Sequence, residues 1–363
     1  MVNKATKLLG VATGLLVLGM SSSDKVFAVE RGPLLISEVP THQMYSEEDI
    51  NDIKLQEVIS HKGNEQNTLE KEYSLFQKIK NINSNSLSPD QVEFLKTASK
   101  HQATAYTQHP EGPIAVQIFD VASLAKHKLF LHDVELQKST LEPFWDSNPS
   151  LFVKKSLESS VNAQAAKALL NEKGELSSVN VELLVDAYSS TDNIKGHSLL
   201  QQLVAKTSSM KAAQALLNSS HKSPIKHQLL SSLEKYFSEI DQETLLREQV
   251  TTKSELTSQA LIEYGKLPLS VIKIDILYSK LSDAEVGASS AFALSKILKV
   301  SSDYSQLLNN LKEKKNSRIE TANSLLALKM ANSPDANHVL RKVLENDYIQ
   351  FDDIKAEVTT WLN

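Results

Sequence analysis

Apolar residues recur at helical spacing through the C-terminal two-thirds of the chain, from about residue 148 onward. Leu199, Leu200, Leu203 and Val204 illustrate this spacing, which places apolar side chains along one face of a helix. Two kinds of helical segment alternate, and each pair occupies about thirty residues. The pattern predicts a series of amphipathic helical hairpins.

The segments fall into two alternating sets. The first set comprises 197–206, 226–235, 257–266, 287–296, 321–330 and 355–363. The second set comprises 179–188, 208–217, 241–250, 268–280, 301–313 and 333–346. The segment 268–280 contains the run VIKIDIL, whose alternation is typical of a strand. Its flanks and its place in the repeat favour a helix.

Several helix starts are marked by the sequence. Ser223-Pro224 and Ser333-Pro334 each place a capping hydroxyl before a proline at the first helical position. The segment 282–285, Ser-Asp-Ala-Glu, fits a capping box and predicts a third start.

Alanine returns at one position of the repeat. Ala260, Ala291 and Ala322 are each thirty-one residues from the next. A single helical hairpin cannot bury its apolar stripe alone, so it stacks on its neighbour, and small residues let the two backbones approach. These alanines are therefore expected where successive hairpins meet.

The repeated hairpins resemble the HEAT/armadillo class of helical repeats over roughly residues 115–363. The resemblance implies an all-α fold, a right-handed α-solenoid of stacked helical hairpins, with the array spanning 113–363. The preceding region, 29–112, contains three polar helical segments at 46–59, 68–82 and 88–101. We expect this region to form an N-terminal helical cap, because terminal repeats need a polar outer face.

The first 28 residues have the order of a secretory signal peptide. Lys4 and Lys7 precede an apolar run at 8–20, and a small-x-small pattern ends at Ala28. We expect cleavage near Ala28 and a periplasmic or secreted protein. No later segment is long and apolar enough to predict a membrane span.

Composition excludes several kinds of partner and site. The chain has no cysteine, which excludes disulfides and thiolate metal sites. Its net charge of −5 becomes −7 once the expected signal segment, with three lysines and one aspartate, is removed. A mildly acidic protein has no electrostatic footprint for nucleic acid.

Signatures of catalysis and of cofactor binding are nearly absent. The sequence has no HExxH, GxSxG, GxGxxG or P-loop motif. SxxK occurs at 123–126 and 208–211, but without the elements that accompany it in penicillin-binding enzymes, so chance in a Ser- and Lys-rich chain explains it. Four histidines lie between residues 101 and 132 without metal-ligand spacing and are interpreted as surface residues. We expect no metal and no cofactor.

One charged pattern has two explanations. Five lysines lie near the ends of successive segments of the first set, and two tyrosines lie close to them. These candidate partner-binding residues are Lys206, Lys235, Tyr236, Tyr264, Lys266, Lys296 and Lys329. Lysine at a helix C-terminus offsets the negative end of the helix dipole, which is the simpler explanation. The functional alternative is a cationic ridge for an acidic partner protein. In the same way, the tyrosines are either core residues or contact anchors.

Three functions remain open from the sequence. The leading hypothesis is an exported, non-catalytic protein-binding scaffold, monomeric, that uses an extended solenoid surface. The second is a carbohydrate-active enzyme of (α/α)-toroid type, although only two tryptophans are present and no carboxylate pair stands out. The third is a foldase or inhibitor that assists another exported protein.

Overall fold

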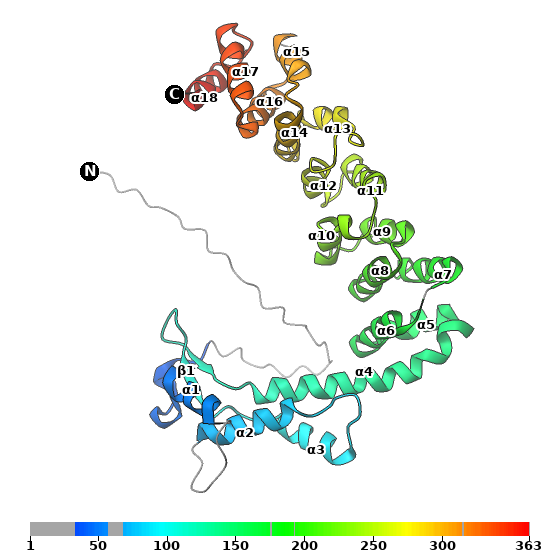
Figure 1. Ribbon diagram of the computed structural model, residues 1–363. Coiled ribbons are helices and arrows are strands. Elements are labelled where there is room, and N and C mark those ends of the chain that lie inside the picture. Colours follow the sequence, from blue (N-terminus) through cyan, green and yellow to red (C-terminus); the bar gives the residue numbers. More distant parts are fainter. Residues whose placement is uncertain (1–32, 57–67, 175, 192, 314–315, 363) are drawn as a thin grey trace. The chain divides into compact units, whose positions relative to one another are not determined.

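The computed structural model describes residues 33–56, 68–174, 176–191, 193–313 and 316–362 (Figure 1). Over these residues the chain is all-α apart from one short β-hairpin, which confirms the predicted fold class at this level. None of the described helices has the length and hydropathy needed to cross a membrane. The expected signal peptide, 1–28, lies outside the described residues. Internal contacts divide the chain into two units, and the division falls between Glu135 and Leu136.

Unit 1 contains short helices and one hairpin. Its elements are the 3₁₀ helices η1 (Ile36–Glu38) and η2 (Thr41–Gln43), the helices α1 (Glu47–Gln56), α2 (Thr68–Lys80) and α3 (Pro89–Ala98), the strands β1 (Tyr106–Gln108) and β2 (Ala115–Gln117), and the first part of α4 (Val121–Ser147). The three helices confirm the three polar helical segments expected before residue 112. Ser88 caps α3 as part of a capping box with Gln91.

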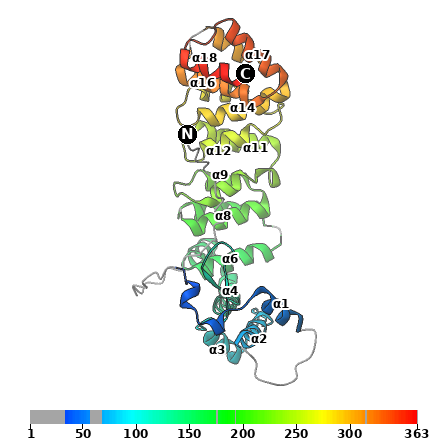
Figure 2. The same cartoon turned by 90° about the vertical axis from the view of Figure 1, so that its left-hand side faces the viewer.

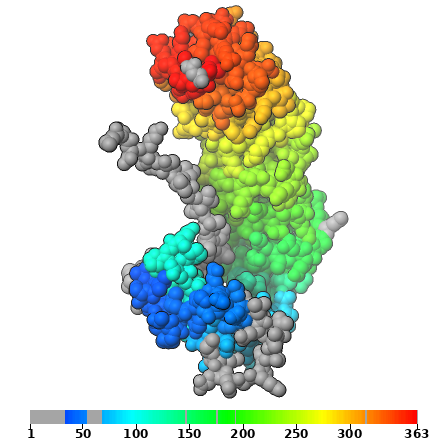
Figure 3. Space-filling view, turned by 60° about the vertical axis from the view of Figure 1, so that its left-hand side comes forward, coloured from blue at the N-terminus to red at the C-terminus, as the bar shows by residue number. Residues whose placement is uncertain are grey.

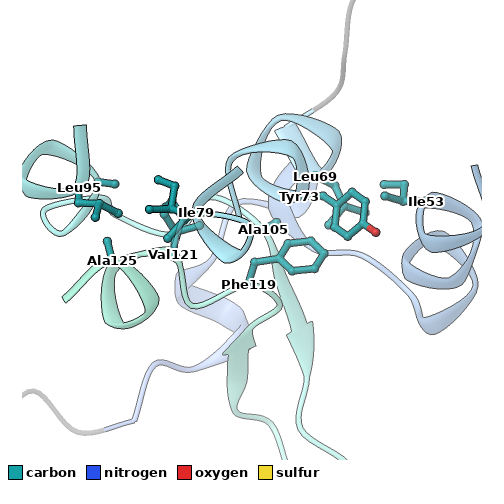
Figure 4. Close-up of a cluster of buried hydrophobic side chains, with 11 residues drawn as sticks. Ile53, Leu69, Tyr73, Ile79, Leu95, Ala105, Phe119, Val121 and Ala125 are labelled. Atoms are coloured by element: carbon teal, nitrogen blue, oxygen red, sulfur yellow. The ribbon is translucent and has the colours of Figure 1, made fainter. Parts of the chain in front are cut away.

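The core of unit 1 forms where α2, α3 and the start of α4 meet. Tyr73 and Phe119 lie with their ring centroids 5.2 Å apart, and Leu95 lies near Ala125 (Figure 4). Phe119 and Ala125 belong to this core although they follow residue 112, where the sequence suggested a boundary. The packing therefore places 113–135 with the N-terminal helices, because these residues bury their apolar side chains there.

The hairpin was not predicted, because strands of three residues are too short to show alternation. β1 and β2 are antiparallel, with Tyr106 opposite Gln117. The N-terminal segment covers both edges. Ala115 N donates to Leu34 O at 2.8 Å on one edge, and Tyr45 N donates to Tyr106 O at 2.9 Å on the other.

Unit 2 contains the end of α4 and a run of short helices. These are α5 (Pro149–Ser156), α6 (Ser160–Glu172), α7 (Ser178–Ser189), α8 (Ile194–Thr207), α9 (Met210–Leu217), α10 (Pro224–Leu230), η3 (Leu233–Lys235), α11 (Glu239–Thr251), α12 (Thr257–Tyr264), α13 (Ile274–Lys280), α14 (Gly287–Ser301), α15 (Ser305–Glu313), α16 (Arg318–Ala331), α17 (Pro334–Glu345) and α18 (Asp352–Leu362). The VIKIDIL run lies partly in α13, so the preference for a helix there is confirmed.

The helices of unit 2 pack in two layers that follow the two sets in the sequence. In one layer α6, α8, α10, α12, α14, α16 and α18 each contact the next. In the other layer α5, α7, α9 and α11 do the same, α15 packs on α17, and α13 packs on α14. Figures 1 and 2 show these helices following one another in sequence order, and Figure 3 shows the same order on the surface, from green to red.

Polar contacts between neighbouring helices of one layer repeat with the sequence period. Ser258 Oγ lies 2.5 Å from Ser289 Oγ, and these residues are 31 apart in sequence. Gln259 Nε2 donates to His227 O at 3.0 Å over a separation of 32 residues. In the other layer, Gln249 Nε2 donates to Asn218 Oδ1 at 2.6 Å over 31 residues. Equivalent positions of successive hairpins therefore touch.

Small residues allow the closest helix contacts, as the sequence indicated. Ala260 and Ala291 are fully buried, whereas Ala322 is only partly buried. A close approach of two backbones joins Gly265 to α14, where a Cβ on residue 265 would lie 2.6 Å from Ala293 Cα. A side chain of any size there would collide with the backbone of α14.

The predicted helix starts agree with the structure in two of three cases. Ser223 Oγ accepts from Ile225 N at 3.2 Å, and Ser333 Oγ accepts from Ala336 N at 3.1 Å. The capping box expected at 282–285 is wrong. Asp283 Oδ1 instead accepts from Glu285 N at 2.8 Å in a turn, and α14 begins only at Gly287. The hydrogen bonds to the Asp283 carboxylate lower its pKa.

Candidate functional site

The five lysines singled out from the sequence all belong to one layer of unit 2. They lie on or just beyond consecutive helices of the layer formed by α8, α10 with η3, α12, α14 and α16. Their positions relative to the helix ends vary. Lys266 follows the end of α12, whereas Lys296 lies five residues before the end of α14. The five lysines share one layer, as the repeat pattern of the sequence indicated, but the surroundings of their side chains differ.

Lys206 forms hydrogen bonds to the C-terminal end of the neighbouring helix, α6. Its Nζ donates to Asn171 O at 3.0 Å and also to Lys173 O, at the end of α6. The last carbonyls of a helix lack partners within the helix, so this lysine satisfies groups that would otherwise need water. Lys206 thus serves the C-terminus of α6, whereas the simpler explanation from the sequence concerned the end of its own helix.

Two further lysines lie over aromatic rings. Lys296 Nζ is 5.0 Å from the centroid of the Phe292 ring, and Lys329 Nζ is 4.2 Å from that of Trp361. A cation over a ring face is attracted by the ring quadrupole, yet its N–H groups can still reach an acceptor. Lys266 pairs with Glu263 Oε2 at 2.7 Å, and Lys235 is exposed at the end of η3.

The two tyrosines differ sharply. Tyr264 is fully buried, which agrees with the explanation of this tyrosine as a core residue rather than a contact anchor. Its hydroxyl donates to Glu243 Oε1 at 3.0 Å and accepts from Lys273 N at 3.1 Å. Burial raises the pKa of Tyr264 to about 12, although the bond from Lys273 N opposes the rise. Tyr236 is partly buried and packs edge-on against Phe237.

Lys266 and Lys296 meet at one groove, which we call the lysine groove. It has a volume of about 470 Å³ and lies between the chain that follows α12 and the last turns of α14. Its lining residues are Gly265, Lys266, Leu267, Pro268, Leu269, Lys296, Ile297, Lys299 and Val300. Three lysines thus line one groove of a protein whose net charge is negative.

Lys299 was missed from the sequence. It lies in the last turn of α14, three residues beyond Lys296, and it forms no ion pair with any described residue. A spacing of three residues places Lys296 and Lys299 on one helix face, so the sequence alone could have indicated this pair. What the sequence did not show is that the chain after α12 brings Lys266 to the same place. The close approach of Gly265 to Ala293 does this.

Carboxylates lie on both sides of the lysine groove. One adjoining hollow, of about 270 Å³, shares Lys266, Leu267 and Pro268 with the groove and is also lined by acidic residues. The acidic residues of that hollow are Glu234, Glu239 and Glu263. A second hollow, of about 590 Å³, shares Leu269 and Ile297 and contains Asp275 and Asp303. Positive charge is therefore concentrated at the lysine groove itself.

A similar hollow lies between two earlier helices of the same layer, but it offers less positive charge. A hollow of about 410 Å³ is lined by Gly174, Leu176, Lys206 and Thr207. It lies between the chain after α6 and the end of α8, as the lysine groove lies between the chain after α12 and α14. Its one lysine is Lys206, which is already bonded to carbonyls of α6 and the residue after it. The lysine groove is therefore the stronger candidate for a binding site, because its lysines are not all engaged by helix-end carbonyls.

Unit 1 contains a part-buried hydrogen bond between a histidine and a carboxylate that sequence reasoning missed. His101 had been interpreted as a surface residue, but its Nε2 lies 2.6 Å from Glu72 Oε1, which also accepts from Thr104 N at 3.0 Å. Glu72 is 2% exposed, and its other oxygen has no hydrogen-bond partner among the residues that the structure describes. A buried carboxylate needs such compensation, so the pair joins α2 to the chain after α3. The described residues contain no cluster of three metal-ligating side chains.

Comparisons with known proteins add no relative. No family model matches the chain, and neither do the curated proteins or the solved structures that were searched.

Proposed function

We propose that the chain is an exported, non-catalytic scaffold that binds another protein. In this proposal, unit 2 is a right-handed α-solenoid of the HEAT-like kind, and residues 29–112 form its helical cap. The observation that carries the proposal is the layer packing. In one layer each helix from α6 to α18 contacts the next, the other layer is continuous from α5 to α11, and polar contacts recur at about one repeat length. Stacked hairpins of this sort offer extended surfaces for binding, an analogy drawn at the level of the fold.

The exposed lysines of unit 2 support an acidic protein as the class of partner. Lys235, Lys296 and Lys299 are exposed and, among the described residues, none of the three has a carboxylate partner. Surface charge of one sign steers association with an oppositely charged protein. We therefore propose an acidic partner, with the scaffold acting as a monomer. A nucleic acid is not proposed, because the chain as a whole is acidic.

The export part of the proposal rests on residues 1–28 of the sequence. Expression of the full chain in a bacterial host is expected to yield a periplasmic or secreted product that begins near Val29. N-terminal sequencing and fractionation check this. A product that stays in the cytoplasm with residues 1–28 intact would contradict export.

The binding part is tested with the chain lacking residues 1–28. The immobilised protein is incubated with an envelope extract at low and at high salt, and retained proteins are cross-linked and identified. We expect a retained acidic protein whose recovery falls as salt rises, because exposed charges are screened beyond about 10 Å at 0.1 M salt. Failure to retain any protein at either salt concentration would overturn the scaffold proposal.

A further inference from the structure

The lysine groove combines exposed apolar side chains with cations. Val300 is 74% exposed and Leu269 is 41% exposed, and both line the groove beside Lys296 and Lys299. Ile297 forms the buried floor between them. Removing apolar area from water is favourable by about 25 cal/mol per Å², so a ligand that covers Val300 and Leu269 gains from the contact. The ligand must also accommodate the adjacent ammonium groups of Lys296 and Lys299, and an anionic group would be attracted to them.

The charge of the residues that line the groove favours an anionic ligand. Lys266 is compensated by Glu263. The C-termini of α12 and α14 each add at most about half a negative charge. Lys296 and Lys299 remain, since one lies over a ring and the other has no ion pair among the described residues. The remaining positive charge suits one or two carboxylates rather than a highly charged polyanion.

We propose that the lysine groove binds an acidic peptide segment of the partner protein. A large apolar side chain of the peptide packs against Leu269, Ile297 and Val300, and an adjacent carboxylate lies between Lys296 and Lys299. The inference rests on the proposed function and adds the position and chemistry of one contact. The groove volume of about 470 Å³ is within the range of pockets that bury small ligands.

The flanking carboxylates argue against an anionic membrane as the ligand. A bilayer surface covers a wide area and would also meet the acidic side chains on both sides of the groove. These are Glu234 and Glu239 on one side and Asp275 and Asp303 on the other. A single peptide segment is narrow enough to contact the lysines without covering all four carboxylates. Like charges brought together oppose binding, so the peptide is favoured.

The test uses the chain without residues 1–28 and fluorescent synthetic peptides. The first peptide is rich in Glu and Asp and has a central Leu-Phe pair. In a second peptide Ser replaces the Leu-Phe pair, and in a third Lys replaces the acidic residues. Phosphatidylglycerol vesicles serve as the anionic membrane. Fluorescence anisotropy reports peptide binding, and sedimentation reports vesicle binding.

Variants locate the contact. Lys296→Glu and Lys299→Glu are each expected to weaken binding of the first peptide about tenfold, because each removes one charge-assisted contact and adds repulsion. Val300→Ser is expected to weaken it about threefold through the lost apolar contact. Lys342→Glu, an exposed lysine in the last turn of α17, is the matched control and should leave affinity unchanged. Circular dichroism verifies that each variant is folded.

Each outcome has a stated meaning. Binding of the first peptide alone, weakened by the groove variants and not by Lys342→Glu, supports the proposal. Equal weakening by Lys342→Glu, or none by the groove variants, overturns the groove as the site. Binding to vesicles without peptide binding overturns the peptide as the ligand. If no peptide binds while the wild-type chain retains a protein from the extract, only this inference fails. If neither occurs, the proposed function fails as well.

Discussion

At the scale of single residues, the same side-chain type has different roles according to what the fold places beside it. Lys206 satisfies helix-end carbonyls, Lys266 pairs with Glu263, and Lys296 lies over Phe292. All three had the same interpretation in the sequence, as lysines near helix ends. The partners of Lys266 and Lys296 lie three and four residues earlier in the sequence, whereas those of Lys206 belong to the preceding repeat and could not be read from local spacing.

Tyr264 provides a prediction at this scale. Tyr264→Phe is expected to lower the free energy of unfolding at pH 7 by about 1–2 kcal/mol, because the buried Glu243 carboxylate loses a donor and the N–H of Lys273 loses its acceptor. Below pH 10 this stabilising contribution is fully present. It is lost as pH rises from about 10 toward 12, because the pKa of Tyr264 rises from 10.0 to about 12 on folding.

Urea unfolding of the wild type and of Tyr264→Phe, followed by circular dichroism over a series of pH values, checks this prediction. The difference in unfolding free energy should shrink as pH rises through that range. Tyr236→Phe, at a partly buried tyrosine of the same layer, is the control for loss of a hydroxyl and should cost less at pH 7. A difference between wild type and Tyr264→Phe that stays constant up to pH 12 would contradict the raised pKa.

At the scale of elements, the hydrophobic pattern was sufficient to identify the helices of unit 2 from α7 onward. Every segment of both sets corresponds to a helix of unit 2, including α13 with its β-branched run. The prediction of a helix start failed at 282–285, where a short polar motif can form either of two local hydrogen-bond patterns. The sequence 282–285 satisfied the requirements of a capping box, but Asp283 bonds within a turn and α14 starts later. Local hydrogen bonding permits both arrangements, and packing selects one.

The contact between α12 and α14 gives the prediction at this scale. Gly265→Ala is expected to lower the free energy of unfolding by about 1–3 kcal/mol, because the added Cβ would lie 2.6 Å from Ala293 Cα. Backbone strain does not contribute, since residue 265 has a φ of −68°, which alanine adopts freely.

Gly174→Ala is the matched control for that substitution, because a Cβ there meets no atom within 4 Å. It is expected to leave stability unchanged or slightly raised, through the reduced entropy of the unfolded chain. Urea unfolding measures both variants. Equal stability of Gly265→Ala and wild type would show that α12 and α14 are not in tight contact.

At the scale of the whole molecule, the interpretation of unit 2 as a stack makes the effect of truncation local. A chain that ends at Asn332 lacks α17 and α18, which pack on α16 and on each other. In a stack each repeat contacts only its neighbours, so the loss of hydrogen-exchange protection should be confined to α14–α16. Protection in α6–α12 should remain. Hydrogen exchange with mass spectrometry makes the measurement.

A substitution in the middle of unit 2 is the companion to this truncation. Leu261→Asp, at a fully buried position of α12, should reduce protection mainly in α10–α14. If the truncation instead removes protection as far as α5, the first and last repeats depend on each other. That result would contradict the stack and favour a closed ring.

The sequence by itself determined the all-α class, the positions of the helices from α7 onward, and the period at which hairpins follow one another. These follow from apolar spacing, capping residues and small residues, which act within one or two turns of chain. Tertiary structure alone decided that Tyr264 is buried, that Glu72 pairs with His101, and that Lys266 meets Lys296 and Lys299 at one groove. These features depend on distances between segments far apart in the chain, and no local pattern of residues fixes such distances.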